Sequence, residues 1–155
     1  MKVIAFTDMA ADDQAQLRRA VEQTRFSLNK NSNPQVASIL QTESGATYVG
    51  NNIFLSNCTL VCSEASALSA AVAAGDLAMR RVYMAVRRKD GSESSLISPC
   101  GNCRQMLHDF AVLANHSIVV MSTTNLMQDV LMTDSDELLP EGFKSVSLGK
   151  LSSSS

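Results

Sequence analysis

Apolar positions in the first third of the chain follow two different periods. Over residues 12–28, side chains such as Leu17 and Ala20 recur at helical spacing among charged neighbours, which predicts an amphipathic helix. The stretch 35–54 (QVASILQTESGATYVGNNIF) has no such period. Its β-branched and apolar runs, interrupted by the turn residues 43–45, predict two strands joined as a hairpin.

The rest of the chain alternates between helical and extended patterns. We expect an Ala-rich helix over 62–74 closed by Gly75, a strand over 80–88, a helix from Gly101, strands at 116–122 and 126–132, and a short helix over 135–143 stopped by Pro140. The order α-β-β-α-β-α-β-β-α predicts an α/β fold, with a mixed five-stranded sheet and helices on both faces. Residues 1–150 should form a single domain, and the low-complexity tail 151–155 (LSSSS) should be unstructured.

Composition and charge narrow the functional class. The chain is 45% hydrophobic and 18% charged with a net charge of −2, and it has no dense Lys/Arg stripe, so binding of long nucleic acid is disfavoured. No apolar run reaches membrane-spanning length, and the N-terminus lacks a secretory cleavage pattern. We therefore expect a cytoplasmic protein without a membrane partner, in which the four cysteines serve a metal or catalysis before disulfides.

Three cysteines and one glutamate carry the chemistry. Cys62, Cys100 and Cys103 each fall at or near a predicted helix N-terminus, where unpaired amides and the helix dipole favour the metal-binding thiolate. Three thiolates would give Zn²⁺ three protein ligands and leave a fourth position for water, whose pKa the metal lowers. Glu64, two residues after Cys62, would lie beside the metal and could carry the protons of a hydrolytic reaction.

The motifs CSE (62–64) and SPCGNCRQ (98–105) resemble those of the zinc-dependent cytidine deaminase family in its three-cysteine branch. The resemblance extends from the first helix to ELLPEGF and implies the family's three-layer fold, zinc as the cofactor and usually a homotetramer. It implies hydrolytic deamination of a cytosine nucleoside at C4, with Glu64 protonating N3 and the leaving amine. Backbone groups at Ser63 and Ser98 would hold the base.

The sequence departs from the family at three positions, two that contact the substrate in relatives and one that offsets the negative charge of the metal-binding thiolates. Where relatives have an Asn and a Glu that bind the ribose, this chain has Asn52 and Phe54, or Asn51 and Ile53 if the match shifts by one residue. Pro34 stands where an aromatic residue commonly contacts the substrate. The Arg that usually follows the catalytic Glu is replaced by Ala65, so we expect Arg104 to offset the charge of the thiolates.

Two of these departures, the missing ribose Glu and the missing Arg, are shared with blasticidin S deaminase, a relative that acts on a cytosine-bearing antibiotic. There, too, an aromatic residue follows Asn-Val, much as Phe54 follows Asn52-Ile53. A deaminase of such a specialised aminopyrimidine is therefore the alternative to a cytidine or deoxycytidine deaminase.

Other interpretations remain open. Cys58 could join the three cysteines in a closed four-thiolate structural zinc site without catalysis, as in a binding or assembly protein. Editing of a polynucleotide base is disfavoured by the missing basic groove. His108 and His116 are more simply surface or capping residues than ligands or bases.

Overall fold

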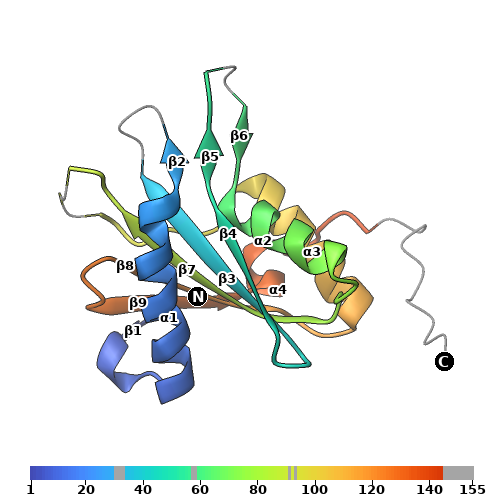
Figure 1. Cartoon of the computed structure of the whole chain (residues 1–155). Helices are drawn as coiled ribbons and strands as arrows, with labels where there is room; N and C mark the ends of the chain where they lie inside the picture. Colours follow the sequence, from blue (N-terminus) through green and yellow to red (C-terminus); the bar gives the residue numbers. More distant parts are fainter. Residues whose placement is uncertain (30–33, 57–58, 91, 93, 145–155) are drawn as a thin grey trace.

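The fold is known from a computed structural model, which describes residues 1–29, 34–56, 59–90, 92 and 94–144 (Figure 1). The predicted tail at 151–155 lies outside these residues. No helix in the described ranges is both long enough and apolar enough to cross a membrane.

A mixed sheet forms the centre of the described structure. Its six strands lie in the order β1 (Lys2–Ala5), β9 (Asp129–Asp134), β8 (Val119–Thr124), β7 (Met79–Arg87), β3 (Gln35–Thr42) and β4 (Thr47–Asn51). The β7–β8 pair is parallel and the other neighbours are antiparallel, which confirms the mixed α/β sheet.

The predicted strand count of five was wrong by one. The short run KVIA at the start of the chain forms β1, which pairs antiparallel with β9 from Lys2 opposite Met132 to Ala5 opposite Asp129. Four residues with mostly exposed side chains give no clear alternation of buried and exposed positions, so the strand is formed by its pairing with β9 and not by a pattern of its own.

A second, smaller sheet rises beside the main one. It has the order β2 (Leu28–Asn29), β5 (Ile53–Phe54) and β6 (Leu60–Val61), and it projects at the top of Figure 1. The predicted first helix extended into this sheet by mistake. The α-helix α1 spans Ala11–Gln23, a 3₁₀ turn η2 follows at Thr24–Phe26, and Leu28 lies in β2.

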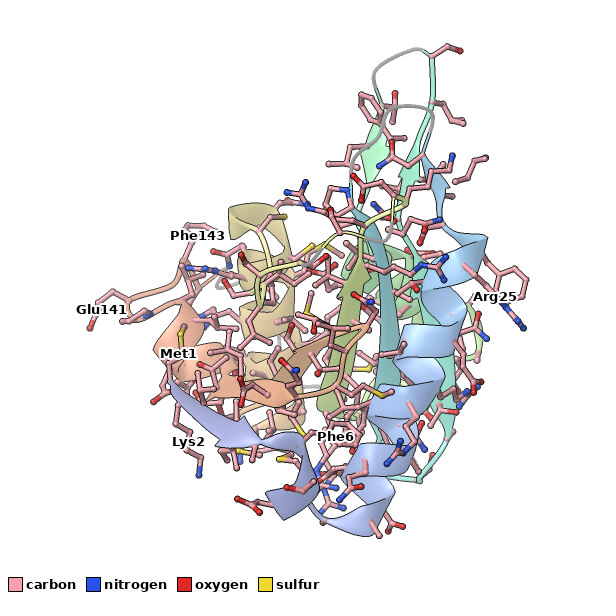
Figure 2. The ribbon with its side chains drawn as sticks, turned by 90° about the vertical axis from the view of Figure 1, so that its left-hand side faces the viewer. Met1, Lys2, Phe6, Arg25, Glu141 and Phe143 are labelled. Atoms are coloured by element: carbon pink, nitrogen blue, oxygen red, sulfur yellow. The ribbon has the colours of Figure 1, made fainter. Side chains whose placement is uncertain are left out.

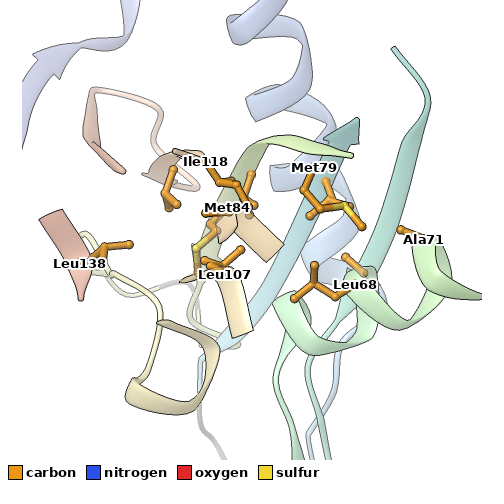
Figure 3. Packing of buried hydrophobic residues seen from close by; sticks show 12 residues of the cluster. Leu68, Ala71, Met79, Met84, Leu107, Ile118 and Leu138 are labelled. Atoms are coloured by element: carbon orange, nitrogen blue, oxygen red, sulfur yellow. The ribbon is translucent and has the colours of Figure 1, made fainter. Parts of the chain in front are cut away.

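Helices cover both faces of the main sheet, as predicted. On one face, α2 (Ser63–Ala73), α3 (Gly101–Ala114) and the short α4 (Ser135–Leu138) bury an apolar core. Figure 3 shows its centre, which includes Leu68, Met79, Met84, Leu107, Ile118 and Leu138. On the other face, α1 and the preceding 3₁₀ turn η1 (Phe6–Asp8) bury a second core that includes Phe6, Leu17, Ala20, Ile39, Tyr83 and Met121 (Figures 1 and 2).

The turns that shape these elements follow the sequence closely. Gly45 has φ +85° in the β3–β4 turn, a conformation that glycine adopts without strain. Gly75 (φ +74°) follows the end of helix α2 at Ala73; its amide donates to Val72 O and the Asp76 amide donates to Ala71 O. This pair of bonds is the Schellman pattern that terminates helices, and it confirms the predicted stop.

Candidate active site

Two helix N-termini bring the three predicted cysteines together. Cys62 is the N-cap residue of α2, Cys100 is the N-cap residue of α3, and Cys103 lies in the first turn of α3. The Sγ atoms of Cys62 and Cys100 are 3.6 Å apart, and the three sulfurs all lie within 4.8 Å of one another. All three cysteines are free thiols.

The electrostatics of this cluster favour a bound cation. Burial, the hydrogen bond with Cys100 and the charge of Glu64 raise the pKa of Cys62 to about 11. Burial and then the Glu64 charge raise the pKa of Cys103 as well. Burial opposes ionisation of Cys100 too, but hydrogen bonds from the Cys103 amide, the Cys103 thiol and Cys62 lower its pKa overall. The three sulfurs lie so close together that they cannot all ionise without a positive charge among them. A bound divalent ion supplies that charge and stabilises the thiolates, so this set of donor atoms fits Zn²⁺.

The alternative of a fourth thiolate depends on Cys58, which lies outside the described residues. The three sulfurs that the structure places together are those predicted to bind the metal.

Glu64 is buried beside the cluster in the first turn of α2. Its side chain is 4% exposed, and its Oε2 accepts a hydrogen bond of 2.9 Å from the Ser63 hydroxyl. The positive end of the helix dipole favours a carboxylate at this position.

A cavity of about 340 Å³ extends from the cysteines and Glu64 towards the small sheet. It is lined by Asn29, Pro34, Val36, Asn52, Phe54, Leu60, Cys62, Ser63, Glu64, Met84, Ile97, Ser98 and Cys100. The structure therefore brings all four residues predicted to bind the substrate, Asn52, Phe54, Ser63 and Ser98, to the same cavity as Glu64 and two of the cysteines. Neither histidine is among the lining residues, and His116 instead pairs with Glu43 at 3.0 Å.

The Asn52 amide is already hydrogen-bonded to the backbone. Its Oδ1 accepts from the Val36 amide at 2.9 Å, and its Nδ2 donates to the Pro34 carbonyl at 3.0 Å. These bonds fasten the end of β4 to the start of β3, so Asn52 shapes the cavity wall. Direct contact of Asn52 with the substrate stays a prediction.

Sequence reasoning missed Asn29, which is 6% exposed and finds no hydrogen-bond partner for its Oδ1 among the described residues. Asn29 lies opposite Phe54 in the parallel β2–β5 pair, and both residues line the cavity. A buried amide without a partner is costly, so this side chain is suited to a ligand. One asparagine in the polar run NKNSNP carries no signal that distinguishes it from a loop residue.

Arg104 holds the segment before Cys100. Its Nε donates to the Pro99 carbonyl at 2.8 Å and its guanidinium donates to Ser98 Oγ at 2.8 Å, with a longer bond of 3.4 Å to the Leu138 carbonyl. Of the three residues that accept these bonds, Ser98 lines the cavity. Its effect on the thiolate charge stays a prediction.

The comparisons with known proteins agree with this site. Residues 10–121 match the family described as the cytidine and deoxycytidylate deaminase zinc-binding region, a range that contains Cys62, Glu64, Cys100 and Cys103. The cytidine deaminase from Burkholderia pseudomallei is 25% identical and superposes with a TM-score of 0.72 over 87% of this chain and 100% of that one.

Two further structures share the fold at lower identity. The cytidine deaminase from Mycobacterium leprae is 24% identical, with a TM-score of 0.64 over 86% of this chain and 100% of that one. The enzyme from Mycobacterium tuberculosis is 18% identical, with a TM-score of 0.67 over 88% of this chain and 100% of that one. Given the family match over 10–121 and the three-sulfur site, the chain belongs to the cytidine and deoxycytidylate deaminase family and is a zinc-dependent hydrolytic deaminase.

Proposed function

We propose that the protein deaminates a cytosine nucleoside, either cytidine, deoxycytidine or a close analogue, to the uracil form. The observation that carries this proposal is the buried Glu64 carboxylate, which lines one cavity together with Cys62 and Cys100. The cavity of about 340 Å³ is of the size that takes a small molecule.

Cys62, Cys100 and Cys103 would hold the zinc ion. Bound zinc supplies a Lewis acid that lowers the pKa of a coordinated water. The reaction adds one water at C4 of the base, breaks the C4–N bond and releases ammonia. Glu64 accepts a proton from the water and delivers protons to N3 and to the departing amino group. Ser63 and Ser98 border the same cavity and would hold the base through their backbone groups.

The outer part of the cavity favours a second candidate substrate. Phe54 lines the wall where the family's ribose-binding carboxylate is expected, and Glu64 is the one carboxylate among the described lining residues. Pro34 and Leu60 add apolar surface there. A blasticidin S-like or other specialised aminopyrimidine, which does not depend on a carboxylate for its sugar, fits this wall as the alternative.

We also propose a homotetramer in which neighbouring subunits cover the mouth of the cavity. Five large apolar side chains around the small sheet are exposed by 36% to 60%: Phe26, Leu28, Leu55, Leu60 and Val61. Phe143, labelled in Figure 2, is 73% exposed on the segment after α4. Exposed apolar surface of this kind is typical of subunit contacts.

The free thiols of the metal site are consistent with action in the reducing cytoplasm.

A comparison of four candidate substrates tests the proposal. Zinc-loaded protein would be mixed with cytidine, deoxycytidine, free cytosine and blasticidin S, and ammonia release and the absorbance of the base would be followed for each. We expect turnover of at least one N1-substituted cytosine. Failure on all four compounds, with zinc bound, would contradict the proposed function. Light scattering after size exclusion would test the tetramer separately.

A further inference from the structure

A chain of two hydrogen bonds joins strand β3 of the main sheet to the Glu64 carboxylate. Ser63 Oγ donates to Glu64 Oε2 at 2.9 Å and lies 2.8 Å from Ser38 Oγ on β3. A hydroxyl has one proton, and Ser63 gives its proton to the carboxylate. Ser38 must therefore be the donor in the other bond, so the chain runs from Ser38 through Ser63 to Glu64.

All three members of the chain are buried. Ser38 is 0% exposed, Ser63 is 1% exposed and Glu64 is 4% exposed. Bulk water therefore cannot readily replace either hydroxyl if it is removed. Hydrogen bonds to an ionised group are stronger than those between neutral groups, and a donor that is itself hydrogen-bonded is polarised further. Within the described structure Ser63 fixes Oε2, which leaves Oε1 without a protein partner.

The fold makes room for this chain at Gly50. Ser38 on β3 is opposite Gly50 on β4 in the antiparallel register. A Cβ atom at Gly50 would lie 2.0 Å from the Ser63 carbonyl oxygen and 2.4 Å from the Ala67 amide nitrogen. Because glycine has no side chain, the first turn of α2 can lie directly against the sheet, where the Ser63 hydroxyl reaches Ser38.

We propose that Ser63 and Ser38 are positioning residues for catalysis, which hold one carboxylate oxygen of Glu64 so that the other faces the reacting base. This inference rests on the proposed function, since it assigns the two hydroxyls to the proton transfer that Glu64 performs. Proton transfer requires donor and acceptor within hydrogen-bond reach, and small displacements of a catalytic group are costly to the rate.

The test is a double-mutant cycle on kcat with Ser63→Ala, Ser38→Ala and the double variant, using the aminopyrimidine that wild type deaminates best. We expect kcat to fall about tenfold in Ser63→Ala and about threefold in Ser38→Ala, with KM changed less than twofold. Since Ser38 acts only through Ser63, the double variant should match Ser63→Ala. Ser69→Ala is the control, because the Ser69 hydroxyl is exposed on the same helix and donates to the Ala65 carbonyl oxygen.

Zinc content and thermal unfolding are measured on every variant. Ser38 lies on a strand away from the metal ligands, so Ser38→Ala keeps the test decisive even if Ser63→Ala binds zinc poorly. Unchanged kcat in both single variants, a loss confined to KM, or an approximately thirtyfold multiplicative loss in the double variant would each overturn the inference. If wild-type zinc protein deaminates no aminopyrimidine, the proposed function itself fails, and that result is distinct from all three.

Discussion

Asn29 and Phe54 are backbone partners across the parallel β2–β5 pair, and both side chains line the outer part of the cavity. One is a buried amide whose Oδ1 has no partner in the part of the chain that the structure describes, and the other is an aromatic ring where relatives are expected to place a carboxylate. In the proposed complex, they would present the substituent on N1 of the base with one hydrogen-bonding group and one apolar surface.

Replacing Asn29 with leucine, which has a similar volume, should therefore affect substrates according to that substituent. We expect kcat/KM for the best N1-substituted substrate to fall about three- to tenfold, mainly through KM, because one hydrogen bond is lost. Steady-state kinetics on that substrate and on free cytosine would check this. Free cytosine has no substituent on N1 that could reach Asn29, so it serves as the internal reference. An equal loss of kcat/KM on both compounds would contradict the proposal that Asn29 binds the N1 substituent.

Removal of a metal-ligating thiol should abolish zinc binding, whereas removal of the fourth cysteine should not. Cys62→Ala and Cys100→Ala each delete one of three sulfurs that lie within 4.8 Å of one another, and we expect substoichiometric zinc and loss of turnover. Cys58→Ala, the matched control, should keep one zinc per chain and near-wild-type activity. Metal analysis after dialysis is the measurement, and loss of zinc in Cys58→Ala would favour the closed four-thiolate site.

A methyl group at Gly50 should be poorly tolerated. The added Cβ would meet the Ser63 carbonyl at 2.0 Å, so α2 must move away from the sheet and take Cys62 and Glu64 with it. We expect Gly50→Ala to lose at least about 3 kcal/mol of unfolding free energy, together with activity. Chemical denaturation would be compared with Gly101→Ala, where the same methyl meets nothing within 4 Å. Equal stability of the two variants would show that α2 does not depend on this close approach.

Because the Tyr83 hydroxyl is buried, the free energy of unfolding should decrease as the pH rises from 10 to 12. It donates to Asp13 Oδ1 at 2.8 Å and lies 3.3 Å from Gln41 Oε1, and the bond to Asp13 fastens α1 to the sheet. Burial, and then the hydrogen bond to Asp13, raise the pKa of Tyr83 from about 10 to about 12. Above pH 10 the unfolded chain loses this proton while the folded chain keeps it, so the contribution is present below pH 10 and is lost towards pH 12.

Tyr83→Phe isolates that contribution. We expect the variant to be about 1–2 kcal/mol less stable at pH 8, since Asp13 loses a donor, and to show a shallower decline in stability between pH 10 and pH 12 than wild type. Urea unfolding at several pH values measures both. Parallel declines in the two proteins would mean that Tyr83 titrates as an ordinary exposed tyrosine.

Much of the metal site was predictable because each half of it is local in sequence. Cys62 and Cys100 are N-cap residues of the helices expected there, and Cys103 follows within one helical turn. The spacing of Cys62 and Glu64 likewise places both at the start of α2. Spacing on a regular helix explains why Cys100 lies near Cys103 and Cys62 near Glu64, whereas the approach of Cys62 to Cys100, 38 positions apart, depends on how α2 and α3 pack in the fold.

What escaped prediction depends on contacts between distant segments. Ser38 and Ser63 meet across 25 positions, and only the close approach at Gly50 allows it. β1 forms because β9 offers it an edge, and Leu28 leaves the predicted helix because β2 pairs with β5. The hydrogen bonds of Arg104 to Ser98, Pro99 and Leu138 likewise carried no sequence signal, while its effect on the thiolate charge stays a prediction.

The central claim is that Glu64 carries the protons of a zinc-dependent deamination. The most direct measurement is the loss of cytidine absorbance on mixing with zinc-loaded protein, in wild type and in Glu64→Gln, with the zinc content of both determined. The substitution keeps the size of the side chain and removes its proton-accepting carboxylate. We expect the wild-type protein to turn over cytidine and Glu64→Gln to lose at least about 10³-fold in turnover rate, with one zinc still bound per chain. Comparable turnover by the two proteins at equal zinc content would contradict it.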